Sequence, residues 1–134
     1  MTPTLLALLG FLSWTLVLLI LMEALRGWLV VSGRVPANGF SPDNAGLSPF
    51  MQRLARAHAN CLEGLALFGG FMVLAVIAGR SQITDPLAFV LLGARIAQSL
   101  VHLASTSALA VTLRFAAFTG QMAIVAYWAM ALHG

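Results

Sequence analysis

Four long apolar segments constrain this chain more than any other feature of its sequence. They cover roughly Thr4–Val31, Pro49–Ala78, Pro86–Ser105 and Val111–Leu132. A helix of about 20 mostly apolar residues crosses the hydrocarbon core of a bilayer, so each segment is long enough to do so. The chain is 60% hydrophobic and 8% charged, and such a composition cannot cover a surface that faces water. We therefore predict an all-α membrane protein, a bundle of four transmembrane helices in which residues 1–134 form a single membrane domain.

The connections between these segments carry the turn-forming residues. Ser32–Ser48 is rich in Gly, Pro, Asn and Asp, which predicts an exposed polar loop. Tight connections are expected around Arg80–Asp85 and Ser105–Leu109. The N-terminal segment has no positive start and runs apolar too far for a signal peptide, so we expect it to be a retained first span.

The arginines predict how the chain is oriented in the membrane. Five of the seven basic residues lie near the first and third connections, which are at the same side of the membrane; they are Arg26, Arg34, Arg53, Arg56 and Arg114. Only Arg80 lies at the other side. The positive-inside rule then places the Ser32–Ser48 loop in the cytoplasm and both termini outside. The compact chain lacks lysine and sorting signals, which favours a bacterial inner membrane. No basic stripe is interleaved with aromatics, so we predict no nucleic-acid partner.

Several residues are predicted to have structural roles only. Cys61 is the single cysteine, which excludes an internal disulfide and leaves no Cys/His spacing for a metal, so we expect a small buried residue and no metal site. Glu23 and Arg26, three residues apart, are expected to form an intrahelical ion pair. His58 points away from the other polar groups of its segment, which favours a structural histidine.

Polar side chains form a stripe on three of the four predicted helices. Their spacings of three and four residues place each set on one helix face. The sets are Arg53, Arg56, Asn60 and Glu63 in the second segment; Arg95, Gln98, Ser99, His102 and Thr106 in the third; Arg114 and Gln121, with Thr119 to the side, in the fourth. Ionisable groups inside a span usually face the bundle interior and indicate a functional site. Interhelical hydrogen bonding is the favoured role for five of the uncharged members, which are Gln98, Ser99, Thr106, Thr119 and Gln121.

Depth and charge together predict a cationic pocket. Because consecutive spans run antiparallel, Glu63 and His102 lie at about the same depth and are expected to be neighbours. Arg95 lies nearer the bilayer middle, where Glu63 is its expected partner. Since Arg56, Arg95 and Arg114 outnumber this one acid, the pocket suits an anionic ligand, and the apolar helix faces beside it suit a lipophilic one.

The second segment also carries a long motif. From Arg53 to Glu63 it reads R-L-A-R-A-H-A-N-C-L-E, which resembles the R-x-x-R-A-H-x-N-x-x-E signature of the membrane-associated proteins in eicosanoid and glutathione metabolism, the MAPEG family. The segment G-A-R-I-A from Gly93 is similar to the third helix of that family. Arg114 with Thr119 resembles its fourth helix, and Ala37 with Asn38 its first loop. The resemblance covers nearly the whole chain.

The resemblance implies a homotrimer of four-helix subunits that bind glutathione at each subunit interface, on the cytoplasmic side. By match to the motif, Asn60 and Glu63 would contact glutathione, and Arg56 would support its carboxylates. Arg114 would be the catalytic residue, since an adjacent cation stabilises the thiolate that acts as nucleophile. We predict six glutathione-binding residues, which are Arg53, Arg56, Asn60, Glu63, Arg95 and His102.

The chain departs from the family pattern at four positions. Ala59 stands where prostaglandin- and transferase-type members carry a basic residue, Gln98 and His102 replace His and Tyr, and Phe115 replaces Ser. His102 would then be the hydrogen-bond donor in place of the tyrosine.

The residues leave three candidate functions. The first is a glutathione-dependent transferase or peroxidase that acts on lipophilic electrophiles or lipid hydroperoxides. The second is a non-catalytic member of the fold that binds a lipid or an anion. The third, a small four-span multidrug exporter, fits poorly, because its acid would be Glu23 and Arg26 lies beside it.

Overall fold

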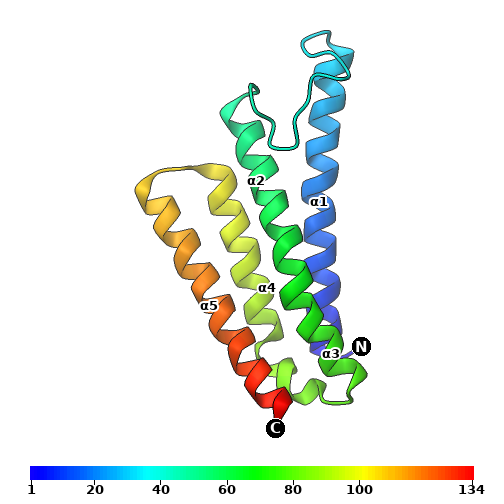
Figure 1. Ribbon diagram of the computed structural model, residues 1–134, viewed down its shortest axis with the longest axis vertical. Helices are drawn as coiled ribbons and strands as arrows, with labels where there is room; N and C mark the ends of the chain where they lie inside the picture. The colour runs from blue at the N-terminus through cyan, green and yellow to red at the C-terminus, as the bar shows by residue number, and fades with distance from the viewer.

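The computed structural model describes residues 1–134, and every regular element in it is helical (Figure 1). The elements are α1 (Pro3–Val31), α2 (Pro49–Gly64), the π-helical turn η1 (Leu65–Gly69), α3 (Gly70–Ile77), α4 (Ser81–Ala104) and α5 (Ala108–His133). Since the backbone angles stay helical through η1, the elements α2, η1 and α3 form one continuous rod. The four resulting rods are all long and apolar enough to cross a membrane. The prediction of four membrane-spanning helices is confirmed, and the chain is an integral membrane protein.

The two ends of the bundle differ in their connections. Both termini and the α3–α4 connection lie at one end, and the loop of residues 32–48 lies at the other, together with the α4–α5 connection (Figure 1). Three rods begin at a hydroxyl side chain: Thr2, Ser48 and Ser107 each accept a hydrogen bond from a backbone N–H three residues further on. These caps satisfy amide groups that have no partner within the helix.

Helix α4 begins at Ser81, five residues before the predicted start at Pro86. The polar residues of this first stretch bond to the start of α1. The Asp85 carboxylate accepts hydrogen bonds from the backbone N–H of Thr4, at 3.0 Å, and from the Thr4 hydroxyl. The hydroxyls of Thr4 and Thr84 lie 2.6 Å apart. A segment that composition alone indicates as a turn is therefore helical, because the N-terminus of another helix satisfies its polar groups.

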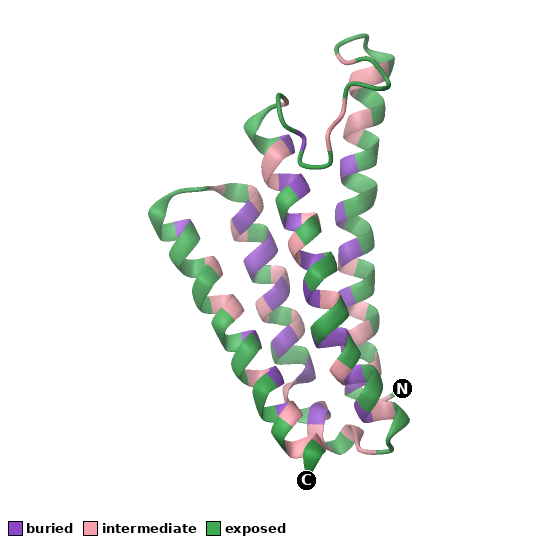
Figure 2. Cartoon of the chain, viewed as in Figure 1, coloured by how far each residue is buried: buried purple, intermediate pink, exposed green.

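Helix α4 is the centre of the bundle and contacts each of the other helices, whereas α5 contacts mainly α4 and α3. The buried apolar residues form two clusters. The larger lies toward the termini and contains Phe11, Phe68, Leu91 and Trp128; the smaller lies toward the loop and contains Leu18, Leu54 and Cys61. Exposed side chains cover the outer sides of α1 and α5 (Figure 2), and most of the large ones are apolar, as contact with lipid or another subunit requires.

The long loop is held by Arg26 and Asn44. Arg26 pairs with Glu23 at 3.2 Å, which confirms the predicted intrahelical pair. Its Nε and Nη2 also donate to Oδ1 of Asn44, at 2.9 and 2.6 Å. Asn44 is fully buried and donates through Nδ2 to the carbonyl of Met51, at 2.7 Å. The loop is thereby fixed to both α1 and the start of α2.

Candidate functional site

A groove between α2 and α5, with α4 behind it, holds three adjoining cavities. Their volumes are about 300, 230 and 110 Å³, and Asn60 lines all three. The groove exists because α5 packs on α4 and leaves the facing side of α2 free near the loop end. Asn60 therefore lies where three separate spaces meet.

The largest of these cavities, here called the polar cavity, measures about 300 Å³. Its lining consists almost entirely of polar or charged residues, namely Arg56, Ala59, Asn60, Glu63, His102, Thr106 and Arg114. The predicted neighbours Glu63 and His102 do line one space, as their depths indicated. Five of the seven predicted site residues meet here because the stripe on α2 faces the stripes on α4 and α5.

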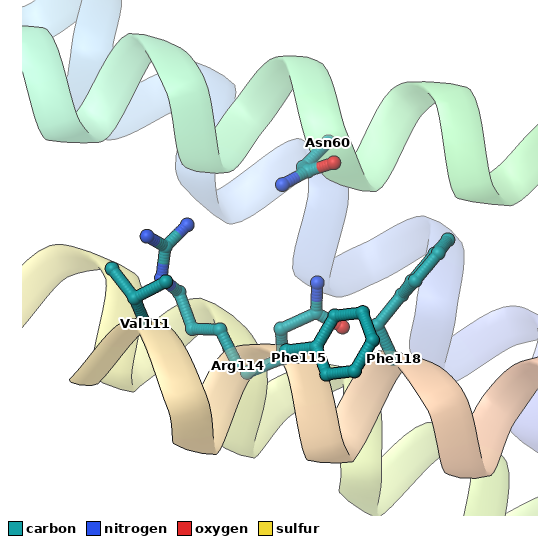
Figure 3. Close-up of a pocket in the computed structure, with 6 residues that line it drawn as sticks. Asn60, Val111, Arg114, Phe115 and Phe118 are labelled. Atoms are coloured by element: carbon teal, nitrogen blue, oxygen red, sulfur yellow. The ribbon is translucent and has the colours of Figure 1, made fainter. Parts of the chain in front are cut away.

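The second cavity, here called the mixed cavity, measures about 230 Å³ and adjoins the first through Asn60 and Arg114. Gln98 and the apolar side chains of Val111, Phe115 and Phe118 complete its lining. Figure 3 shows the Arg114 guanidinium extending from α5 toward α2, with the Asn60 amide reaching from α2 into the same space. Arg114 thus lies between a polar compartment and a largely apolar one.

The charges around the polar cavity are not balanced within the chain. The only ion pair is Glu23–Arg26, so neither Arg56 nor Arg114 is bonded to a carboxylate. Arg114 is half-buried, and its buried Nε has no hydrogen-bond partner. With Glu63 as the only acid in the lining, the cavity carries an excess of positive charge that favours an anionic ligand.

Arg95 lies apart from the cavities, although it was predicted to join them. Its side chain is 1% exposed, and its guanidinium lies over the rings of Phe11, Phe68 and Phe118, at 5.5, 5.5 and 5.9 Å. Nη1 donates to the carbonyl of Asn60 at 3.4 Å, whereas Nε and Nη2 have no partner. Aromatic faces attract a cation and here surround it in place of a carboxylate.

The expected ion pair between Arg95 and Glu63 is absent, so that prediction was wrong. Successive residues on a helix point about 100° apart. Gly64 faces α4 and, having no side chain, leaves room for the guanidinium, whereas Glu63 lines the groove and is exposed. The arginine therefore contacts the backbone of α2 and not its acid.

Arg53 also lies outside the three cavities. Its Nε donates to the carbonyl of Leu103 at 2.9 Å, and its guanidinium lies 6.0 Å from the ring of Phe50. Arg53 therefore links α2 to α4 at the loop end of the bundle.

Of the five uncharged residues predicted to bond between helices, Gln98, Ser99 and Gln121 do so, whereas Thr106 lines the polar cavity and Thr119 is exposed. Gln121 donates to Gln98 between α5 and α4, at 2.8 Å, and the buried Cys61 lies 3.1 Å from the hydroxyl of Ser99. The apolar side chains that line the mixed cavity were not predicted from the sequence. Phe118 follows Arg114 by four residues and so shares its helix face, a spacing that could have identified it.

The fold and site define a class: an integral membrane protein of four helices with a cationic cavity in a groove between its helices. The chain matches the MAPEG family model over residues 4–133, and it belongs to the MAPEG family. It is thus a membrane protein of the eicosanoid- and glutathione-metabolism type. A search of curated proteins and a search of solved structures each found no match.

Proposed function

We propose that the protein is a glutathione-dependent transferase or peroxidase that acts on lipophilic electrophiles or lipid hydroperoxides in the membrane. The charges of the polar cavity carry this proposal. Glutathione with an ionised thiol has two carboxylates, one thiolate and one ammonium group, and the cavity offers Arg56 for the carboxylates, Arg114 for the thiolate and Glu63 for the ammonium group. Asn60 and His102 add further hydrogen-bonding groups to the lining. The charges of the lining are therefore opposite in sign to those of the bound tripeptide.

The two larger cavities suggest how the chain separates its substrates. Bound glutathione would supply the thiol nucleophile. The polar cavity would hold its backbone, and Arg114, on the boundary, would favour the thiolate form of a thiol whose ordinary pKa is about 8.5. Val111, Phe115 and Phe118 would hold the lipophilic electrophile in the mixed cavity, within reach of the sulfur. Neither Arg53 nor Arg95 is needed for these contacts.

Ultraviolet absorbance of the thiolate tests the proposal. Adding glutathione to the purified protein near neutral pH is expected to produce a thiolate signal that saturates, with S-methylglutathione as the control that cannot ionise. No thiolate signal, together with thermal stabilisation by lipids but none by millimolar glutathione, would instead support a non-catalytic lipid-binding protein.

We further propose that residues 1–134 form a single membrane domain that assembles as a homotrimer. Glu63 lies at the midpoint of the α2–η1–α3 rod, Pro49–Ile77, yet it is exposed in the single chain. A carboxylate at that depth is costly if it faces lipid, and a neighbouring subunit would cover it. Native mass spectrometry of the detergent-purified protein is expected to give the mass of three chains; a stable single-chain mass would rule the assembly out.

For its orientation, we propose that the loop of residues 32–48 faces the cytoplasm of a bacterium, with both termini outside the inner membrane. The positions of the arginines support this orientation, because Arg26, Arg34 and Arg53 lie toward the loop end of the bundle and Arg80 lies toward the other end. A C-terminal reporter enzyme that is active only outside the cytoplasm should be active; an inactive one would reverse the orientation.

A further inference from the structure

A buried pair of glutamines lies behind the mixed cavity. Gln121, on α5, is 0% exposed, and Gln98, on α4, is 5% exposed. Nε2 of Gln121 donates two hydrogen bonds, to Oε1 of Gln98 at 2.8 Å and to the carbonyl of Ala117 at 3.1 Å. The pair joins the two helices next to Arg114, the residue proposed to activate the thiol.

The Ala117 carbonyl fixes which way both amides point. A carbonyl can only accept, so the atom of Gln121 that faces it must be the NH₂ group. The same nitrogen faces Gln98, whose oxygen must therefore be the acceptor. The NH₂ group of Gln98 is consequently turned away from Gln121. The Ala117 carbonyl thus fixes the orientation of the Gln98 amide through the side chain of Gln121.

The NH₂ group of Gln98 is available to a ligand in the mixed cavity. Gln98 lines this cavity together with Asn60 and Arg114, and no protein group accepts a hydrogen bond from its Nε2. The cavity therefore has, beside the arginine, a donor that is neutral and whose direction is fixed. Such a donor strengthens anion binding without adding a second charge or a group that titrates near neutral pH.

We propose that Gln121 is a positioning residue, which holds the Gln98 amide so that its NH₂ group donates to a negatively charged sulfur group bound beside Arg114. This inference rests on the proposed function. Without Gln121, the Gln98 amide is free to rotate, and in half of its orientations an oxygen would face the anion. The loss therefore affects ligands with a charged sulfur group far more than ligands without one.

Two glutathione derivatives separate this effect from simple loss of structure. Glutathione sulfonate carries a negative group at the sulfur, and S-methylglutathione carries none, while the rest of the two molecules is the same. Calorimetry on the detergent-purified assembly is expected to show that Gln121→Met weakens sulfonate binding about 10-fold. Binding of the S-methyl derivative should change less than about 2-fold. Gln82→Met, on the exposed start of α4, is the matched control and should change neither.

A double variant tests that the two glutamines act as one unit. Gln98→Met should weaken sulfonate binding at least as much as Gln121→Met, and Gln98→Met/Gln121→Met should be no weaker than Gln98→Met alone. Additive losses, or equal losses for both derivatives, would overturn the positioning role while leaving the proposed function intact. If the wild-type protein binds neither derivative, the proposed function itself is wrong, and this inference is wrong with it.

Discussion

Replacing Arg114 by alanine is expected to lower glutathione-dependent turnover by about 100- to 1,000-fold. Arg114 is the one cation that lines both the polar and the mixed cavity, and no carboxylate of the chain neutralises it. A charge in a partly buried site stabilises a thiolate far more than the same charge would in water. Its loss should remove the thiolate absorbance at neutral pH, whereas Arg56, Asn60 and Glu63 remain to bind the tripeptide. The effect is therefore expected on turnover more than on glutathione affinity.

Two other arginine variants make this prediction specific. Arg114→Lys keeps the charge but not the planar, forked donors, so it should restore part of the thiolate signal. Arg34→Ala removes an exposed loop arginine that lines none of the three cavities, and it should leave turnover unchanged. Thiolate absorbance titrated against pH measures all three variants. An unchanged titration for Arg114→Ala would show that another group ionises the thiol.

The sequence predicted the four spans and most of the polar cavity because both follow from regular spacing. Apolar length identifies a membrane-crossing helix directly. The spacing of Arg56, Asn60 and Glu63 fixes one helix face, and the antiparallel direction of the next span then places His102 at the depth of Glu63. None of these inferences requires knowledge of how individual side chains pack.

Contacts that depend on packing could not be predicted in this way. Three phenylalanines from α1, η1 and α5 surround Arg95, and no spacing rule shows that distant aromatic residues will meet around one cation. The fixed direction of the Gln98 amide depends on a backbone carbonyl in another helix. The early start of α4 likewise depends on Asp85 bonding to the first turn of α1. Each of these contacts depends on where a second helix lies, and the local sequence does not give that position.

Gly64 is the position where a single methyl group is expected to cost the most stability. A Cβ atom at this position would lie 2.6 Å from Nη2 of Arg95 and 3.1 Å from its Cζ. The guanidinium cannot move aside freely, because phenylalanine rings surround it and the Asn60 carbonyl accepts its hydrogen bond. Gly64→Ala should therefore destabilise the fold by about 3 kcal/mol, the upper part of the range for overpacking. Thermal unfolding in detergent measures this loss.

The proposed cause can be separated from a general effect of alanine in a helix. Gly120→Ala, on α5, meets nothing within 4 Å and should raise stability slightly, since alanine favours a helix by about 1 kcal/mol over glycine. In an Arg95→Met background the guanidinium is gone, so adding Gly64→Ala should cost less than about 1 kcal/mol. Asn60 lies one turn before Gly64 and bonds the same guanidinium, so Gly64→Ala should also weaken glutathione binding. An equal loss of stability in both backgrounds would show that the methyl group strains something other than Arg95.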